Sequence, residues 1–171
     1  MAHPKPVIEI RSDLNRLLRE SAELIQILVY RENVIAALHE NDVHKKASIE
    51  HLSSALDRSI RQLWINALLQ VLRVESSHIT VAEITDSKIS NQDLHQPLLQ
   101  RVQYLLKDKT HVLHWLLIQK TIPVQHSEEN ITQRISFIAI DKTAQENAEW
   151  QQRLQHITEL LYELTDWMEE F

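Results

Sequence analysis

The feature that most constrains this sequence is the complete absence of glycine from its 171 residues. Average glycine usage is about 7%, so on the order of a dozen glycines would be expected in a chain of this length. Turns with positive φ, and the loops that cradle nucleotide phosphates, depend on glycine because a Cβ atom would obstruct them. The sequence therefore excludes Rossmann-type and P-loop sites and disfavours hairpin-rich sheets. It predicts an all-α fold, an antiparallel bundle of about four to six helices.

Length and composition indicate one domain that spans residues 1–171. Hydrophobic residues make up 43% of the chain, which is typical of a globular core. Cysteine is absent, which excludes disulfides, zinc fingers and thiol catalysis. The first residues lack the apolar run of a signal peptide, and no apolar stretch is long enough to cross a bilayer. We therefore expect a cytoplasmic protein without membrane contact, and the net charge of −6 disfavours nucleic acid as a partner.

Apolar residues recur at three- and four-residue steps along most of the chain and predict a series of amphipathic helices. The first is expected to begin at Ser12, an N-cap with Asp13 in the first turn, after a flexible segment 1–10. Pro97 belongs in the first turn of a helix that begins at Asp93, because an interior proline costs about 3 kcal/mol. The expected helices cover residues 12–38, 43–73, 93–105, 110–120 and 143–171, with a further short helix after the capping box at 80–83.

The last predicted helix has the most regular pattern. Its apolar residues follow at steps of 4, 3, 4, 3, 4 and 3, a heptad seam, and Thr143 begins a capping box at its start. The seam consists of Trp150, Leu154, Ile157, Leu161, Leu164, Met168 and Phe171. Before this helix, β-branched residues at 135–140 predict a short extended segment that lies across the bundle. The sequence leaves the conformation of the surrounding residues 121–142 open.

The second half of this last helix is negatively charged, with five carboxylates and no lysine or arginine after Gln155. One interpretation is a docking surface for a basic partner, and the other is the solvated outer face of an amphipathic helix. Anions at a helix C-terminus oppose the helix dipole, so we expect a cation nearby. It would come from Arg11, Arg16 or Arg19 of the first helix, or from a partner protein. The five carboxylates are Glu159, Glu163, Asp166, Glu169 and Glu170.

The ten histidines of the chain raise the question of metal binding. His44 and His51 are seven residues apart and share a helix face, and His111 with His114 forms an i, i+3 pair. A di-iron bundle needs two Glu-x-x-His motifs and two further glutamates, whereas residues 75–78 alone match that motif. We therefore expect these histidines to lie at the surface or in an interface, and we expect no metal and no other cofactor.

Arg73 and His78 have the Arg-x4-His spacing of ribonucleases of the HEPN class, which are also helical bundles. In such an enzyme the arginine would stabilise phosphate charge and the histidine would act as general acid or base. With ten arginines and ten histidines in the chain, one or two such spacings are expected by chance. A valine also follows Arg73 where a polar residue is common in that class. The two residues are catalytic candidates, and no residue is assigned a catalytic role.

The chain has four tryptophans, Trp64, Trp115, Trp150 and Trp167, each next to an apolar stripe of a predicted helix. Aromatic side chains can stack on nucleic-acid bases or on a ligand. Aromatic residues at helical spacing more often pack in a core, because they bury a large apolar area. We therefore predict that the tryptophans belong to the hydrophobic core.

Several features follow one another in a distinctive order over most of the chain. They are Ala47, His51, Leu52, Ala55 and Leu56; the helical segments 98–106 and 115–117; the apolar segment 137–140; and Trp150 and Trp167 with a terminal aromatic residue. This order resembles a family of uncharacterised gammaproteobacterial proteins of similar length, classed as a domain of unknown function. That family usually has glycines and alanine-rich helices, whereas this chain has no glycine. The resemblance implies an all-helical fold and a bacterial cytoplasmic setting, and it implies no activity.

These observations favour a non-enzymatic helical protein that binds another macromolecule as a small adaptor or regulator. The lack of a complete catalytic or metal motif and the single sign of charge on the last helix support this hypothesis. Two alternatives stay open. One is a ribonuclease that uses Arg73 and His78, and the other is a homodimer in which the C-terminal helix packs against a second copy.

Overall fold

Within the residues that the structure describes, the chain forms six α-helices. A computed structural model describes residues 6–37, 42–73, 81–85, 95–118 and 135–170, and the side chains in these ranges apart from 32–37 and 135–144. The helices are α1 (Val7–Ala37), α2 (Val43–Leu72), α3 (Val81–Thr85), α4 (Gln96–Leu105), α5 (Val112–Leu117) and α6 (Ile135–Glu170). No strand occurs in the described ranges, which confirms the predicted all-α fold.

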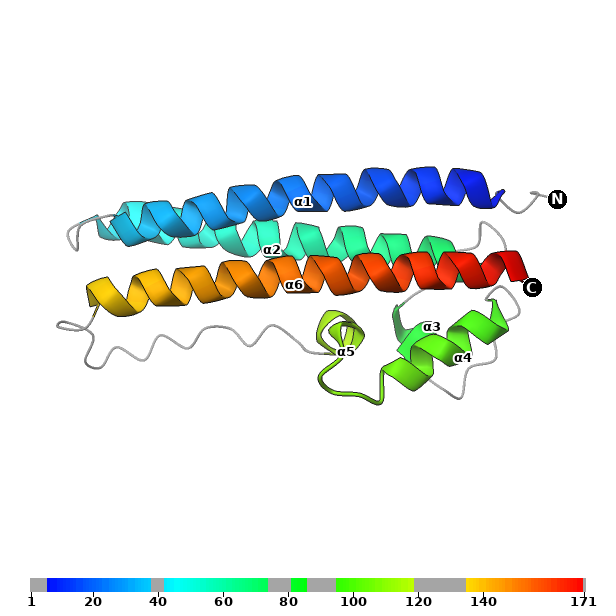
Figure 1. Cartoon of the computed structure of the whole chain (residues 1–171). Helices are drawn as coiled ribbons and strands as arrows, with labels where there is room; N and C mark the ends of the chain where they lie inside the picture. Colours follow the sequence, from blue (N-terminus) through cyan, green and yellow to red (C-terminus); the bar gives the residue numbers. More distant parts are fainter. Residues whose placement is uncertain (1–5, 38–41, 74–80, 86–94, 119–134, 171) are drawn as a thin grey trace.

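Three long helices form the body of the molecule, and α1, α2 and α6 lie side by side (Figure 1). α1 runs antiparallel to both of its neighbours, so α2 and α6 point in the same direction. The short helices α3, α4 and α5 lie on one side of this body, in the half of the bundle where α2 and α6 end. None of the described helices combines the length and the apolar composition that crossing a membrane requires.

The hydrophobic core lies in the half of the bundle that carries the short helices. Among the described side chains, full burial begins at Ile60 in α2 and at Ile157 in α6. The largest side chains with no appreciable exposure are Leu14, Ile25, Ile60, Trp64, Leu68, Leu72, Ile84, Leu98, Leu113, Ile157 and Leu161. Each of the six helices therefore contributes at least one buried side chain to one core.

α1 begins at Val7, earlier than the start predicted at Ser12. The carbonyl oxygen of Pro6 accepts a hydrogen bond from the N–H of Ile10 at 3.3 Å, which closes the first turn. Ile10 is also buried in the core. The predicted start is wrong because packing of this side chain stabilises a turn that the local capping pattern does not indicate. Residues 7–10 of the segment 1–10, which the sequence predicts to be flexible, thus belong to α1.

α6 begins at Ile135 and continues without interruption to Glu170. The extended segment predicted at 135–140 is therefore wrong, and Thr143 lies inside the helix and is not its N-cap. β-branched residues disfavour a helix by only about 0.7 kcal/mol each or less. Extending an existing helix adds one hydrogen bond per residue, and this propagation outweighs the local preference.

The heptad seam of α6 is confirmed as part of the core. Ile157, Leu161 and Leu164 are buried. Trp150, Leu154 and Met168 are partly buried against the same core, and Phe171 lies outside the described residues. The seam therefore packs mainly within this chain, which leaves little of it for a second copy.

The predicted helix at 43–73 agrees with α2, whereas the predicted start of α4 needs correction. α4 begins at Gln96 with His95 as N-cap, not at Asp93, which lies outside the described residues; Pro97 is in the first turn as predicted. Residues 108–110 form the predicted break, because the Asp108 carboxylate accepts hydrogen bonds from both the N–H and the hydroxyl of Thr110, at 2.8 and 2.7 Å.

α5 is shorter than the predicted helix at 110–120, since it spans Val112–Leu117. The predicted short helix after Thr80 is confirmed as α3, although Thr80 itself lies outside the described residues. The short helices α4 and α5 matter for the site because they pack against α6.

Candidate functional site

The acidic half of α6 lies against arginines of the same chain. Nη2 of Arg11 in α1 is 2.7 Å from Oδ1 of Asp166 and 3.3 Å from Oε2 of Glu169. Arg101 in α4 donates from Nε and Nη2 to Oε1 of Glu163, at 3.2 and 3.0 Å. The cation expected near the end of this helix is therefore Arg11 of the first helix, which offsets the unfavourable interaction of the anions with the helix dipole.

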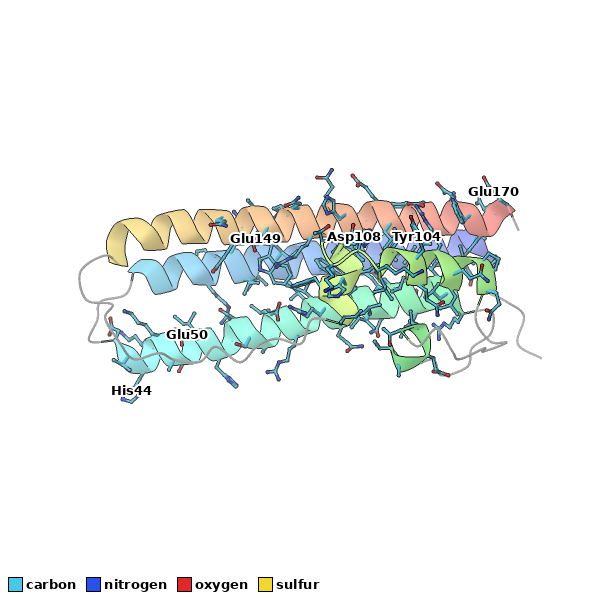
Figure 2. All side chains as sticks on the ribbon, turned by 90° about the horizontal axis from the view of Figure 1, so that it is seen from below. His44, Glu50, Tyr104, Asp108, Glu149 and Glu170 are labelled. Carbon is cyan, nitrogen blue, oxygen red and sulfur yellow. The ribbon has the colours of Figure 1, made fainter. Side chains whose placement is uncertain are left out.

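The five candidate carboxylates consequently do not form one free surface. Three of them take part in the ion pairs just described. Glu159 accepts a hydrogen bond from Nε2 of Gln155 at 2.9 Å, and Glu170 is exposed at the end of the helix (Figure 2). A basic partner would have to displace Arg11 or Arg101 to reach the paired carboxylates. Partner binding at the C-terminal half of α6 stays a prediction, and fewer unpaired carboxylates are available there than the sequence implies.

The candidate metal-binding histidines lie in two separate elements. His44 and His51 are exposed in α2, and Figure 2 shows that His44 points away from the bundle at the start of that helix. His111, which directly precedes α5, and His114, which lies within it, are both half-buried. In the described part of the chain, no three histidine, aspartate or glutamate residues are placed so that they could hold one metal ion.

His111 has a structural role as the N-cap of α5. Its Nδ1 accepts a hydrogen bond from the N–H of Leu113 at 3.2 Å. This bond requires an unprotonated Nδ1, and therefore a neutral ring with its hydrogen on Nε2. Partial burial lowers the pKa of His111 below the ordinary value for histidine, while the nearby Asp108 carboxylate acts in the opposite direction.

Acidification is therefore expected to weaken α5. Because the folded-state pKa of His111 is lowered, its cap contributes fully above the ordinary histidine pKa of about 6.5 and is lost as the pH falls through the lowered pKa. Between about pH 8 and about pH 5, the free energy of unfolding should fall by about 1 kcal/mol less in the variant His111→Asn than in the parent. The reason is that asparagine can act as the N-cap at either pH. Urea unfolding at both pH values measures this difference. Equal pH dependence of the two proteins would contradict the capping role.

Arg73 follows α2 directly. Its N–H donates to the carbonyl oxygen of Leu69 at 3.2 Å and so caps the C-terminus of the helix. His78, its proposed catalytic partner, lies outside the described residues. The ribonuclease hypothesis therefore stays a prediction without a described pair of side chains.

Three tryptophans from different helices meet in one cluster. The ring centroid of Trp64 in α2 lies 6.0 Å from that of Trp115 in α5 and 6.1 Å from that of Trp150 in α6. The centroids of Trp115 and Trp150 are 5.6 Å apart, in an edge-to-face arrangement. Trp167 is partly buried against the core as well. The predicted core role of the tryptophans is confirmed, and their contacts join α2, α5 and α6.

Two arginines stack on Trp115, a feature that the sequence did not predict. The guanidinium of Arg61 lies 3.9 Å from the ring centroid and that of Arg153 lies 4.3 Å from it. Asp57 pairs with Arg61 at 3.3 Å, and Glu149 pairs with Arg153 at 3.4 Å. Each cation thus already contacts a carboxylate and an aromatic face. The arrangement fastens α5 to the long helices and does not provide a free anion site.

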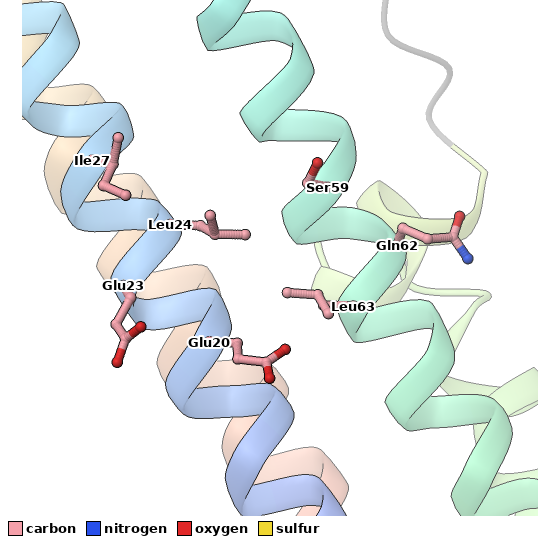
Figure 3. A pocket seen from close by; sticks show the side chains of 7 residues that line it. All are labelled: Glu20, Glu23, Leu24, Ile27, Ser59, Gln62 and Leu63. Atoms are coloured by element: carbon pink, nitrogen blue, oxygen red, sulfur yellow. The ribbon is translucent and has the colours of Figure 1, made fainter.

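An open groove between α1 and α2 is the clearest candidate for a binding site. It has a volume of about 470 Å³ and is lined by Glu20, Glu23, Leu24, Ile27, Ser59, Gln62 and Leu63. Figure 3 shows that Leu24 and Leu63 point toward one another from opposite helices, while Glu20 extends into the groove beside them. Ile27 is 45% exposed, although it is a large apolar residue. We call this surface the α1–α2 groove.

The sequence contains a signal for one wall of this groove. Glu20, Leu24 and Ile27 follow at steps of four and three residues, so they share a helix face that lies beside the buried stripe of α1. Ile27 is not part of that buried stripe, and an apolar residue outside it marks a second apolar face. The other wall comes from Leu63 and its neighbours in α2. Only the packing of the two helices brings the walls together.

A second hollow, of about 550 Å³, lies where α3, α4 and α5 meet. Its lining consists of Thr85, Gln100, Gln103, Tyr104, Leu106, Lys107 and Ile118. Nε2 of Gln103 donates to the carbonyl oxygen of Ile84 at 3.3 Å, so this amide already has a partner. The lining is mixed and mostly uncharged, and it does not select one ligand chemistry. The α1–α2 groove, with its apolar floor and charged rim, is the more specific site.

Comparisons of the chain with protein-family models, with curated proteins and with solved structures found no match. The functional argument therefore depends on the geometry described above.

Proposed function

We propose that this chain is a non-enzymatic binding protein, a small adaptor or regulator, whose α1–α2 groove receives apolar side chains of a partner protein. The observation that supports this proposal is the open apolar floor formed by Leu24, Ile27 and Leu63. Removing such surface from water is favourable by about 25 cal/mol per Å², which offsets part of the entropic cost of association. A groove between two neighbouring helices also matches a recurrent recognition mode, in which a helix of the partner lies in an apolar groove.

The described side chains give the homodimer alternative less support and leave the ribonuclease alternative untested. A homodimer through α6 would need an exposed seam, whereas Ile157, Leu161 and Leu164 are buried within the chain. A ribonuclease would need Arg73 and His78 in one site, and this alternative stays a prediction because His78 lies outside the described residues. We also propose a bacterial cytoplasmic setting, on the strength of the family resemblance.

Photo-cross-linking in cells of the source organism tests the proposal. A cross-linking residue replaces Ser59, which lines the groove, or Gln151, which is exposed on α6. We expect a specific cross-linked protein from position 59, identified by mass spectrometry, and none from position 151. The same products from both positions would contradict a binding role for the groove. A cross-link from position 59 to a second copy of this chain would favour a homodimer instead.

Two isoleucines of α1 form a matched pair for the same experiment. Ile27 lines the groove and is 45% exposed, whereas Ile8 is 78% exposed and does not line it. Replacing exposed Ile27 or Ile8 by Gln should change the stability by less than about 0.5 kcal/mol. We expect Ile27→Gln to reduce the cross-link at position 59 several-fold and Ile8→Gln to leave it unchanged.

A further inference from the structure

We infer that the partner segment in the α1–α2 groove is a basic amphipathic helix. Its apolar side chains would pack on Leu24, Ile27 and Leu63, and its lysines or arginines would lie against Glu20 and Glu23. This inference rests on the proposed function and adds the chemistry of the partner. It is derived from the charges at the rim, the length of the apolar surface and the net charge of the chain.

The two carboxylates at the rim form no ion pair with any of the described residues. Glu20 and Glu23 are exposed, three residues apart, and neither forms an ion pair with another residue in the described part of the chain. Arg16, four residues before Glu20, lies 3.5 Å from Asp13 instead. Arg19, four residues before Glu23, is exposed and forms no ion pair with either carboxylate. Neighbouring like charges on one helix face are mildly unfavourable. A partner that brings positive charge to this rim would therefore gain an attraction and remove a repulsion.

The opposite wall contributes no charge of either sign. Its lining residues are Ser59, Gln62 and Leu63, so the groove as a whole is acidic on one side and neutral on the other. An anionic lipid surface or nucleic acid would be repelled by such a rim. A second copy of this chain, with its own net charge of −6, would be repelled as well. Charge complementarity thus selects a basic protein segment.

The length of the apolar surface fits a short helix. Residues 20 to 27 of α1 extend about 10 Å along the helix axis, at 1.5 Å per residue. Beyond them, Tyr30 in α1 and Leu52 in α2 are 69% and 45% exposed. Tyr30 is three residues after Ile27 and Leu52 is eleven residues before Leu63, so helical spacing puts each near the face of its helix that lines the groove. An amphipathic helix of about 10–14 residues, with anchors at i, i+3 or i+4 and i+7, would cover this distance.

A pair of designed peptides tests the inference on the intact chain. Both are helical 14-residue peptides with the same leucine pattern, and the polar face is lysine in one and glutamate in the other. We expect the lysine peptide to bind at least about tenfold more tightly, as measured by fluorescence anisotropy at low salt. The double variant Glu20→Gln/Glu23→Gln should weaken its binding about three- to tenfold. It should also reduce the salt dependence of the dissociation constant.

Matched variants separate this inference from the proposed function. Glu159→Gln/Glu170→Gln removes two exposed carboxylates of α6, the helix where the sequence suggested a basic partner, and we expect it to leave binding unchanged. Circular dichroism confirms that each variant is folded. If Glu20→Gln/Glu23→Gln binds as the parent does, or the glutamate peptide binds equally well, the basic partner is excluded. In that case Ile27→Gln would still reduce binding if the groove itself is used. If Ile27→Gln and Ile8→Gln bind as the parent does, the groove is excluded too.

Discussion

Replacing Trp64 by Ala is expected to lower the free energy of unfolding by about 3–5 kcal/mol, the largest effect of any single substitution considered for this chain. Trp64 has no exposed surface and is the largest buried side chain. Its ring touches Trp115 and Trp150, so its removal leaves a cavity where α2, α5 and α6 meet. Urea unfolding followed by circular dichroism measures the loss, because three other tryptophans complicate a fluorescence signal.

The variant Trp64→Phe serves as the control. The indole Nε1 of Trp64 is buried without a hydrogen-bond partner among the described residues, so phenylalanine removes volume and sacrifices no hydrogen bond. We therefore expect Trp64→Phe to cost clearly less than Trp64→Ala. If the alanine variant lost less than about 1 kcal/mol, the three rings would not form a packed cluster in solution.

Replacing Leu161 by Ala in α6 is expected to cost about 2–5 kcal/mol. Leu161 is completely buried at the centre of the heptad seam, between Ile157 and Leu164. The lost transfer free energy and the cavity left behind both contribute, and the neighbouring helices cannot close the gap fully. The midpoint of urea unfolding should fall without a change in its slope, since the same surface is exposed on unfolding.

An exposed residue on the same helix provides the comparison for Leu161. Glu159→Ala should change the stability by no more than about 0.5 kcal/mol, because Glu159 is exposed and alanine is a good helix former. Similar losses for the two variants would mean that the seam does not pack in the core. The seam would then be free to contact a second copy of the chain, and light scattering would detect that dimer.

The long-range features of the fold were predictable because they depend on repeated patterns. Many residues at regular steps define the buried faces of α2 and α6, so no single exception obscures them. The starts of α1 and α6 were mispredicted because each inference relied on one capping residue, Ser12 or Thr143. A cap contributes about 1 kcal/mol, which the burial of Ile10 or the extension of a long helix can exceed.

The site was harder to predict than the fold, for a geometric reason. The helix dipole predicts a cation near Asp166, and the sequence offers three arginines of the first helix as candidates. Arg11 is the one that pairs with Asp166. The α1–α2 groove depends instead on the relative positions of Leu24 and Leu63, which belong to different helices. The same holds for the arginines around Trp115. Pattern analysis of one helix at a time does not contain this information.

The direction of the three long helices has a consequence for the order in which the chain can fold. α1 and α2 are adjacent in sequence and antiparallel, so they can pair as soon as both have been synthesised. α6 instead packs on α1, from which it is distant in sequence. Arg11 donates a hydrogen bond to Asp166, and the two residues are 155 positions apart. Closing so long a loop costs entropy before any contact is formed. The first helix therefore keeps one apolar face exposed until α6 has been synthesised and packs against it.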